Sequence, residues 1–428
     1  MSPEQNPGGE SVKTDVPSDI PVDAVVSAPR DASASLQAAA DAVQVASEQQ
    51  DLAAPTPLKP PPPIPPVVDV HDLDWYRIGA SLEPSALRAR MRVTVERFEA
   101  LLDSEDGACM LFDDYREHRS DRALKVAELA DEPLWFIGDL HGDLLALETA
   151  LALIDRESQR EKAAPPRIVL LGDLVDDGGY GLETVLRIFE VILARPRSVC
   201  LIAGNHDESL GYNGARFSAT VSPSDFCEFL NQNLAHEWIG RVGKLLVRIV
   251  ANLPRALFFP DGLLVAHGGF PLTDLHARLA ETRDWNDPQC LNDFVWSRAH
   301  PRARKKLPNR MARGSQFGYE DFGVFCTLSE TLGRPVTHMV RGHDHVDEGY
   351  EIYPAYAATP VLTMISLSRR LEREMYGPFV RVPTAARWIR GSLPQVYRLH
   401  IPGHLVRECY PEATEESAAT PPAPQVAT

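Results

Sequence analysis

Short apolar runs alternate with helical patterns in the middle of the chain. The runs 134–139, 167–173 and 198–207 have the length and composition of buried strands, and the segments 144–154 and 182–193 between them carry apolar residues at helical spacing. This order predicts a βαβαβ series and therefore an α/β fold.

The pattern extends on both sides of this series. Before it, apolar residues recur every three or four positions from Leu87 to Leu102 behind Glu83-Pro84-Ser85, which predicts an amphipathic helix. After it, strands become more frequent than helices. The strand candidates there are 256–259, 263–267, 336–343, 350–353, 361–367 and 395–401.

The two ends of the chain differ from this middle part. Residues 1–74 contain 13 of the 36 prolines, no aromatic residue, and 12 acidic against three basic side chains. Such a composition buries too little apolar surface to offset the entropy of ordering, so we expect a disordered arm at 1–74 and a similar tail at 411–428. One folded domain is predicted over 75–410.

The proline run Lys59–Pro66 within the arm favours polyproline II structure. This run is typical of a semi-rigid spacer, and it is also compatible with a ligand for an SH3-like or WW-like groove. A binding partner of the Pro-rich arm therefore stays open.

The charge and the cysteines exclude several classes of protein. A formal net charge of −17 disfavours general binding to nucleic acid or to an anionic membrane. The sequence has no basic-then-apolar leader and no apolar stretch near the ~18 residues that a spanning helix needs. The six cysteines are far apart, with no CxxC pair, which favours a reducing compartment and a cytoplasmic location.

Five short motifs place Asp, Asn or His beside glycine, several of them at predicted strand ends. Carboxylate, amide and imidazole groups suit a divalent metal, and glycine permits the sharp turn from strand to loop. Asp139 and Asp173 are 34 residues apart, and Asp173 and Asn205 are 32 apart, which is about one βαβ unit each. The side chains are therefore expected to converge. The motifs are Gly138–Gly142 (GDLHG), Gly172–Gly178 (GDLVDDG), Gly204–Asp207 (GNHD), His267–Gly269 (HGG) and Gly342-His343.

In this order the motifs resemble the PPP family of calcineurin-like metallophosphatases, which includes the Ser/Thr protein phosphatases and has the signature GDxHG, GDxVDRG, GNHE, HGG and a late His. The segments 295–297, 312–318, 340–343 and 347–351 are similar to further parts of that pattern. The resemblance covers about 134–367. It implies an α/β sandwich of two mixed β-sheets packed between helices.

The resemblance also implies a dinuclear metal site in which one carboxylate is shared. Two divalent ions, Mn, Fe or Zn, would be bound without a thiolate, and a hydroxide bridging them would attack phosphorus. Asp139, His141 and Asp173 would bind one metal, and Asp173, Asn205, His267 and His343 would bind the other. His206 would be the general acid, and Asp176 would orient its ring and raise its pKa. Arg313 would bind the phosphate.

One departure from the family pattern concerns substrate binding. The arginine that follows the second Asp in GDxVDRG is replaced here by Asp177, so a cation has become an anion. We expect this side chain to turn away from a phosphate or to pair with a base. The segment 298–313 has seven Arg or Lys in sixteen positions, and it is either a solvated basic loop or an auxiliary anion site.

The sequence therefore favours a metal-dependent phosphatase that hydrolyses phosphomonoesters. Phosphoserine or phosphothreonine in proteins is the leading substrate, and a small phosphoester is the other. The alternatives are a dinucleoside polyphosphate hydrolase or phosphodiesterase of the same fold, and a weakly active pseudophosphatase that acts as a binding scaffold.

Overall fold

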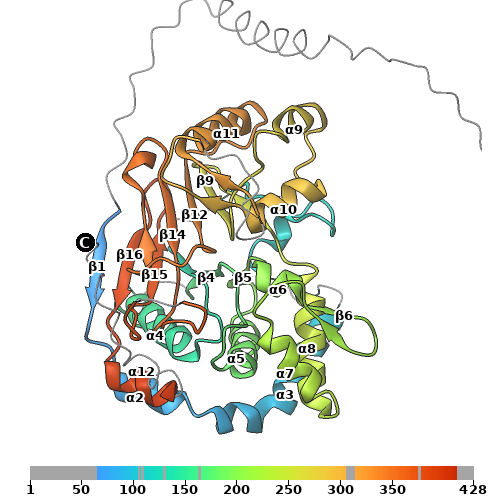
Figure 1. Cartoon of the computed structure of the whole chain (residues 1–428), viewed down its shortest axis with the longest axis vertical. Helices are drawn as coiled ribbons and strands as arrows, with labels where there is room; N and C mark the ends of the chain where they lie inside the picture. The colour runs from blue at the N-terminus through green and yellow to red at the C-terminus, as the bar shows by residue number, and fades with distance from the viewer. Residues whose placement is uncertain are drawn as a thin grey trace, which may run out of the picture. The chain divides into compact units, whose positions relative to one another are not determined.

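Two mixed β-sheets form the centre of the protein (Figure 1). The computed structural model describes residues 65–411, apart from 105, 106, 108, 109, 129–131, 162–164, 305–313, 375 and 376. Within these residues each main sheet has six strands. The first has the order β1 (Val67–Val70), β16 (Gln395–Leu399), β15 (Thr384–Trp388), β3 (Leu134–Ile137), β4 (Arg167–Leu170) and β5 (Val199–Leu201). The second has the order β13 (Tyr350–Glu351), β14 (Val361–Met364), β12 (His338–Arg341), β9 (Leu263–Ala266), β8 (Ala256–Phe258) and β2 (Ala123–Lys125).

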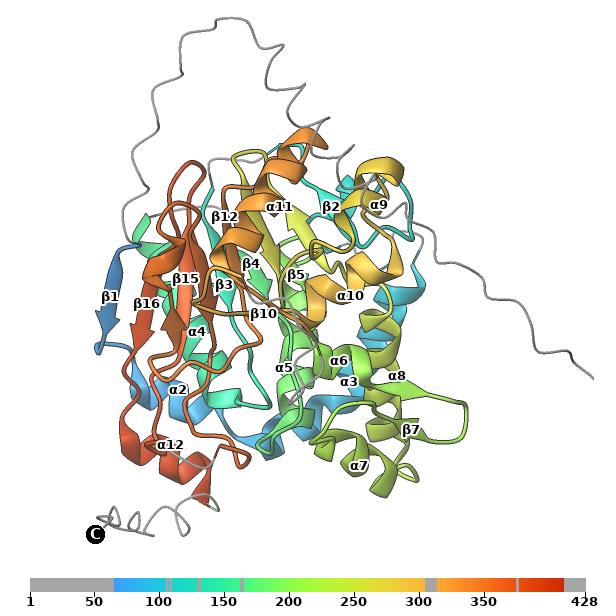
Figure 2. The same cartoon turned by 45° about the horizontal axis from the view of Figure 1, so that its top comes forward.

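Helices cover the outer face of each sheet (Figure 2). Short elements lie in the connections, namely α6 (Asn205–Ser209), β6 (Gly211–Tyr212), β7 (Phe217–Ser218), β10 (Arg298–Ala299) and β11 (Gln316–Phe317). The first sheet packs against α2 (Trp75–Ser81), α3 (Pro84–Asp103), α4 (Leu144–Glu161), α5 (Gly181–Ala194), α7 (Asp225–Gln232), α8 (Glu237–Val250) and α12 (Gly403–Cys409). The second packs against α9 (His276–Thr282), α10 (Pro288–Trp296) and α11 (Tyr319–Thr331).

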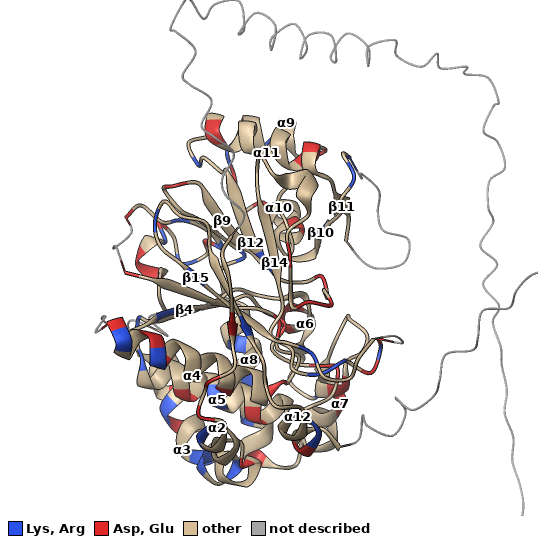
Figure 3. Cartoon of the chain, turned by 90° about the vertical axis from the view of Figure 1, so that its left-hand side faces the viewer, with Lys and Arg blue, Asp and Glu red and all other residues tan. Residues whose placement is uncertain are grey.

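Strand β3 shows why the layers form. Successive side chains of a strand point to opposite faces, so Leu134 and Phe136 pack between the two sheets while Trp135 and Ile137 pack against the helices. All four are buried, which explains why the strand reads as one apolar run. Charged residues lie mainly in the outer helices and the connecting loops, and the strands are largely uncharged (Figure 3). The predicted sandwich of two mixed sheets between helices is confirmed.

The predicted start of the folded domain at residue 75 is wrong. β1 lies inside the predicted arm and pairs in parallel with β16, from Val67 opposite Val396 to Val70 opposite Leu399. Val70 and Leu73 are buried. An edge strand is held by backbone hydrogen bonds and by a few apolar contacts, so it needs neither aromatic residues nor a strong apolar pattern. Residues 1–64 of the predicted arm, which include most of the proline run, and the tail after 411 lie outside the described residues.

Deleting residues 1–74 should therefore destabilise the domain. The deletion removes β1 and the buried side chains of Val70 and Leu73, which should lower the free energy of unfolding by about 2–5 kcal/mol. Deletion of residues 1–64 is the matched control, because it leaves β1 in place. Urea denaturation of the two proteins measures the difference. Equal midpoints would show that β1 contributes nothing to stability.

No helix among the described residues has the length and the apolar content that crossing a membrane requires.

Candidate metal centre

The predicted ligands gather where strands of both sheets end. Asp139 and His141 follow β3, Asp173 follows β4, and Asn205 begins α6 just after β5. His267 directly follows β9, and His343 follows β12 of the second sheet. All six are buried. The fold thus brings together side chains up to 204 residues apart in the sequence.

The backbone around these side chains is unusual. Five of the eight non-glycine residues with positive φ in the described part of the chain lie here, namely His141, Asp173, Asp176, Asp177 and His343. Residues other than glycine rarely adopt this conformation, and its cost is typical of functional sites. Glycine is also required at position 342, where a Cβ atom would collide with the carboxylate of Asp139. This unfavourable backbone conformation is therefore what orients the polar side chains of the site.

Asp139, His141 and His345 form a first cluster with ligand atoms within 4.8 Å of one another. The Nδ1 atom of His141 lies 3.2 Å from the carbonyl of Val175 and must donate to it, which leaves Nε2 with a lone pair. This Nε2 is 3.2 Å from Nε2 of His345. Both imidazoles therefore point at one small volume beside Asp139.

Asp173, His267 and His343 form a second cluster of the same kind. Nδ1 of His267 donates to the carbonyl of Leu171 at 2.8 Å, so Nε2 faces the cluster. This Nε2 lies 3.1 Å from Oδ1 of Asn205 and 3.2 Å from Nδ1 of His343. Four polar side chains thus converge on a second point.

The carboxylate of Asp173 lies between the two clusters. Its Oδ2 is 3.7 Å from Nε2 of His141 and 3.3 Å from Nε2 of His267. Its Oδ1 is used differently, because it accepts the backbone N–H of His206 at 2.8 Å. One oxygen is therefore available to both clusters, as a shared ligand must be.

The electrostatics of the buried ligands fit a bound cation. Burial raises the pKa of Asp139, and its Oδ1 has no hydrogen-bond donor among the described groups. Burial lowers the pKa of His141 and of His343 well below the ordinary value, which keeps these imidazoles neutral. Nε2 of His343 also lacks a partner in the described structure. Burial alone would also lower the pKa of His267, but the carboxylates of Asp173 and Asp139 outweigh it and raise the pKa to about 9, so a cation would have to replace a proton there. Two neutral imidazoles beside an under-neutralised carboxylate are the donor set of a divalent metal, so the residues fit the group that the sequence implies.

His206 and Asp176 form a buried pair beside the second cluster. Nδ1 of His206 is 2.8 Å from Oδ2 of Asp176, whose Oδ1 accepts the backbone N–H of Phe226 at 3.0 Å. Burial alone would lower the pKa of His206, but the carboxylates of Asp173 and Asp176 outweigh it and raise the pKa above its ordinary value. The raised pKa favours the protonated form of His206, which can donate a proton.

A cavity of about 350 Å³ opens above these groups. Asp173, Asn205, His206 and His343 line it, and Arg298, His345 and Arg373 complete its polar wall. Arg313, predicted to bind phosphate, lies outside the described residues, as does most of the basic run 298–313. Within that run, Arg298 reaches the cavity, whereas Arg304 pairs with Glu320 at 2.8 Å.

Asp177 does pair with a base. Its Oδ2 lies 3.0 Å from Nη2 of Arg373, and its backbone N–H donates to Asp225 at 2.8 Å. Burial raises the pKa of Asp177 to about 6, an effect that Arg373 opposes. Neither Arg373 nor His345 was assigned a role from the sequence. The signal for His345 was present, because it stands two residues after His343 in the same loop.

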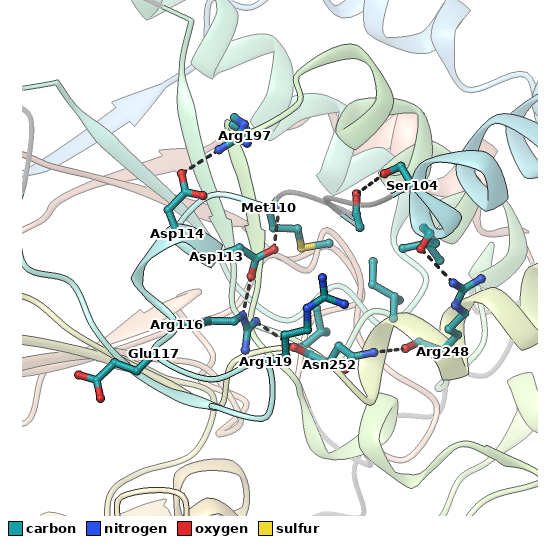
Figure 4. Close-up of a pocket in the computed structure, with 14 residues that line it drawn as sticks. Ser104, Met110, Asp113, Asp114, Arg116, Glu117, Arg119, Arg197, Arg248 and Asn252 are labelled. Atoms are coloured by element: carbon teal, nitrogen blue, oxygen red, sulfur yellow. Dashed lines mark hydrogen bonds and ion pairs between the residues drawn. The ribbon is translucent and has the colours of Figure 1, made fainter.

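Another cavity, of about 450 Å³, is lined by none of the predicted ligands. Figure 4 shows the charged side chains around it. Three of the four arginines that line the cavity form ion pairs with acidic side chains. Arg116 pairs with Asp113 and Arg197 with Asp114, each at 2.8 Å. A surface whose charges are already paired offers little to an ionic ligand.

Comparison with known proteins agrees with this arrangement. Residues 132–347 match the family model described as calcineurin-like phosphoesterase. The chain belongs to that family. The matched segment contains all six predicted ligands, and it ends shortly after the loop that carries His343 and His345.

Curated relatives of this family member include Ser/Thr phosphatases at modest identity. The chain is 26% identical over 226 residues to the "Serine/threonine-protein phosphatase 6 catalytic subunit" of Caenorhabditis elegans, which covers 51% of this chain and 60% of that protein. It is 27% identical over 225 residues to the "Serine/threonine-protein phosphatase 4 catalytic subunit" of Candida glabrata, covering 52% and 65%. The chain thus spans less than two thirds of each relative.

Among solved structures, a protein serine/threonine phosphatase from Saccharomyces cerevisiae has a TM-score of 0.46 and 15% sequence identity. The match covers 72% of this chain and 84% of that one.

Proposed function

We propose that the protein is a metal-dependent phosphatase that hydrolyses phosphomonoesters, with phosphoserine or phosphothreonine in proteins as the leading substrate. The position of Asp173 between the two polar clusters is the observation that carries this proposal. Asp139, His141 and Asp173, joined by His345, would hold one divalent ion. Asp173, Asn205, His267 and His343 would hold the second.

The residues of the chain have separate tasks in this reaction. When bound, the two ions supply an activated water and offset the negative charge of the phosphate. His206 lines the cavity and donates its proton to the oxygen of the leaving alcohol. Asp176 holds the ring of His206 and favours its charged form. The Ser/Thr phosphatase names of the curated relatives support a phosphoprotein as the substrate.

Hydrolysis of a substrate panel tests the proposal, with release of inorganic phosphate measured for the monoesters and product chromatography for the tetraphosphate and the diester. The full chain, loaded in turn with Mn²⁺, Fe²⁺ or Zn²⁺, is given a phosphoserine peptide, p-nitrophenyl phosphate, a dinucleoside tetraphosphate and a phosphodiester. We expect metal-dependent release of inorganic phosphate from the peptide and from the aryl ester, and none after chelation. Turnover of the tetraphosphate or the diester alone would contradict the monoester assignment, and no turnover with any metal would contradict the enzyme.

A further inference from the structure

The wall of the cavity of about 350 Å³ contains a cation, Arg373, that comes from a distant part of the chain and covers Asp177. Arg373 lies in the loop after β14, 196 residues from Asp177 in the sequence. Its Nη2 is 3.0 Å from Oδ2 of Asp177 and 3.1 Å from Nε2 of His345. The anion that replaces the expected arginine is therefore covered by an arginine from elsewhere.

Part of the guanidinium of Arg373 is available to a ligand. Its side chain is 36% exposed and lines the same cavity as Asn205 and His206. In the part of the chain that the structure describes, neither Nη1 nor Nε of this guanidinium donates a hydrogen bond to a protein acceptor. A planar guanidinium that has free donors at the edge of a metal site is suited to phosphate oxygens.

The loop that carries Arg373 is fixed on both sides. Ser368 donates its backbone N–H to Asp143 at 2.7 Å, and Arg369 donates to the carbonyls of His141 and Asp177 at 3.1 Å. On the other side, Glu374 accepts from the backbone of Leu371 at 2.9 Å and pairs with His345 at 3.1 Å. The backbone at position 373 is thus tied to both ends of the first cluster.

The other described arginine of this cavity is already engaged. Nη1 of Arg298 donates to the carbonyl of His343 at 3.0 Å and to Oδ1 of Asp344 at 2.9 Å. It secures the loop that holds a predicted metal ligand. Arg373 instead contacts two side chains, and one of these contacts depends on a lone pair of His345. A cation held by Nε2 of His345 would take that lone pair, and Nη2 of Arg373 would then be free to donate to a phosphate.

We propose that Arg373 binds the phosphate of the substrate and that Asp177 is a positioning residue that holds its guanidinium toward the metal centre. The proposal rests on the proposed function, since it assumes a phosphate-bearing ligand in this cavity. It identifies the substrate group as a phosphate with at least two free oxygens, because a guanidinium beside the metals binds such oxygens pairwise. Where the family pattern has an arginine that contacts the phosphate, this chain has Asp177, which instead positions Arg373.

The first test measures binding of inorganic phosphate to the metal-loaded full chain by calorimetry. Arg373→Ala should weaken phosphate binding by about 10- to 100-fold, the usual effect of losing a charge-assisted hydrogen bond to an anion. Metal content and melting temperature should stay at the wild-type values. Arg370→Ala is the matched control, because Arg370 lies in the same loop but lines a different cavity, and it should leave phosphate affinity unchanged.

The second test separates positioning from simple charge. If Asp177 positions Arg373, then Asp177→Asn weakens phosphate binding in the wild-type background. In the Arg373→Ala background the same change strengthens it, because a repulsive carboxylate is then removed without the loss of a positioned arginine. Metal content is measured in each variant, since Oδ2 of Asp177 also lies 3.2 Å from Nδ1 of His141. Strengthening in both backgrounds would overturn the positioning role. Unchanged phosphate affinity in Arg373→Ala would overturn the phosphate-binding role.

These results are distinguishable from a failure of the proposed function. If no monoester is hydrolysed but Arg373→Ala still weakens phosphate binding, the catalytic proposal fails and the binding role stands. If monoesters are hydrolysed while Arg373→Ala leaves both phosphate affinity and KM at the wild-type values, the role of Arg373 fails alone.

Discussion

Asp173→Asn should abolish phosphatase activity and lower the metal content of the purified protein. Oδ2 of Asp173 is the atom that both polar clusters share, and an amide supplies neither its charge nor a second equivalent oxygen. We expect kcat to fall by at least about a thousandfold, since charge stabilisation at the phosphate depends on both ions. Elemental analysis and phosphate release measure the two effects.

The control for this change is Asp287→Asn. Asp287 is also a buried carboxylate, but it caps α10 by accepting the backbone N–H of Gln289 at 2.9 Å, and asparagine caps helices equally well. This variant should keep its metals and its activity. Two metals and full activity in Asp173→Asn would contradict the shared-ligand assignment.

His206→Ala should lower kcat for a phosphoserine peptide by about 10² to 10⁴ while metal content stays near the wild-type value. This is the usual contribution of a positioned general acid, and the alkoxide of serine is a poor leaving group that requires a proton. The loss should be much smaller with p-nitrophenyl phosphate, whose leaving group departs as a stable anion. Parallel kinetics with the two substrates measure the difference.

His338→Ala is the matched control for His206. His338 is a buried histidine on β12 whose Nδ1 contacts the hydroxyl of Thr337, and it does not line the cavity. His338→Ala should lower the stability of the protein but leave the ratio of the rates with the phosphoserine peptide and p-nitrophenyl phosphate nearly unchanged. An equal decrease in both rates for His206→Ala would count against proton donation by this imidazole.

The sequence predicted the central strands well because they are buried on both faces. The runs at 134–139, 167–173 and 198–207 contain β3, β4 and β5, and α3 covers the predicted helix from Leu87 to Leu102. Strands with weak apolar patterns were missed, both at the edge of the first sheet and inside it. β1 lies in a proline-rich acidic stretch, and β15 reads TAARW, with small residues that fit a crowded position between β3 and β16 but carry no strong pattern.

The candidate ligands were named through the resemblance to the PPP family, whose motifs place each of them beside glycine. The pairing of Arg373 with Asp177 could not be predicted, since it depends on contacts between distant loops. Arg373 reaches Asp177 only because Ser368 and Glu374 tie its loop to Asp143 and His345. No periodicity or motif in that loop indicates where its arginine side chains point. The ion pair between Asp177 and Arg373 can therefore be found only from the structure.

The spread of the ligands over both sheets has a consequence for how the protein is made. At about 5–20 residues per second of synthesis, His343 leaves the ribosome roughly 10–40 seconds after Asp139. His267 and His343 belong to the second sheet, and β15 and β16, which complete the first sheet beside β3, are made later still. Neither cluster of candidate ligands can therefore reach its final geometry until nearly all of the folded domain has left the ribosome.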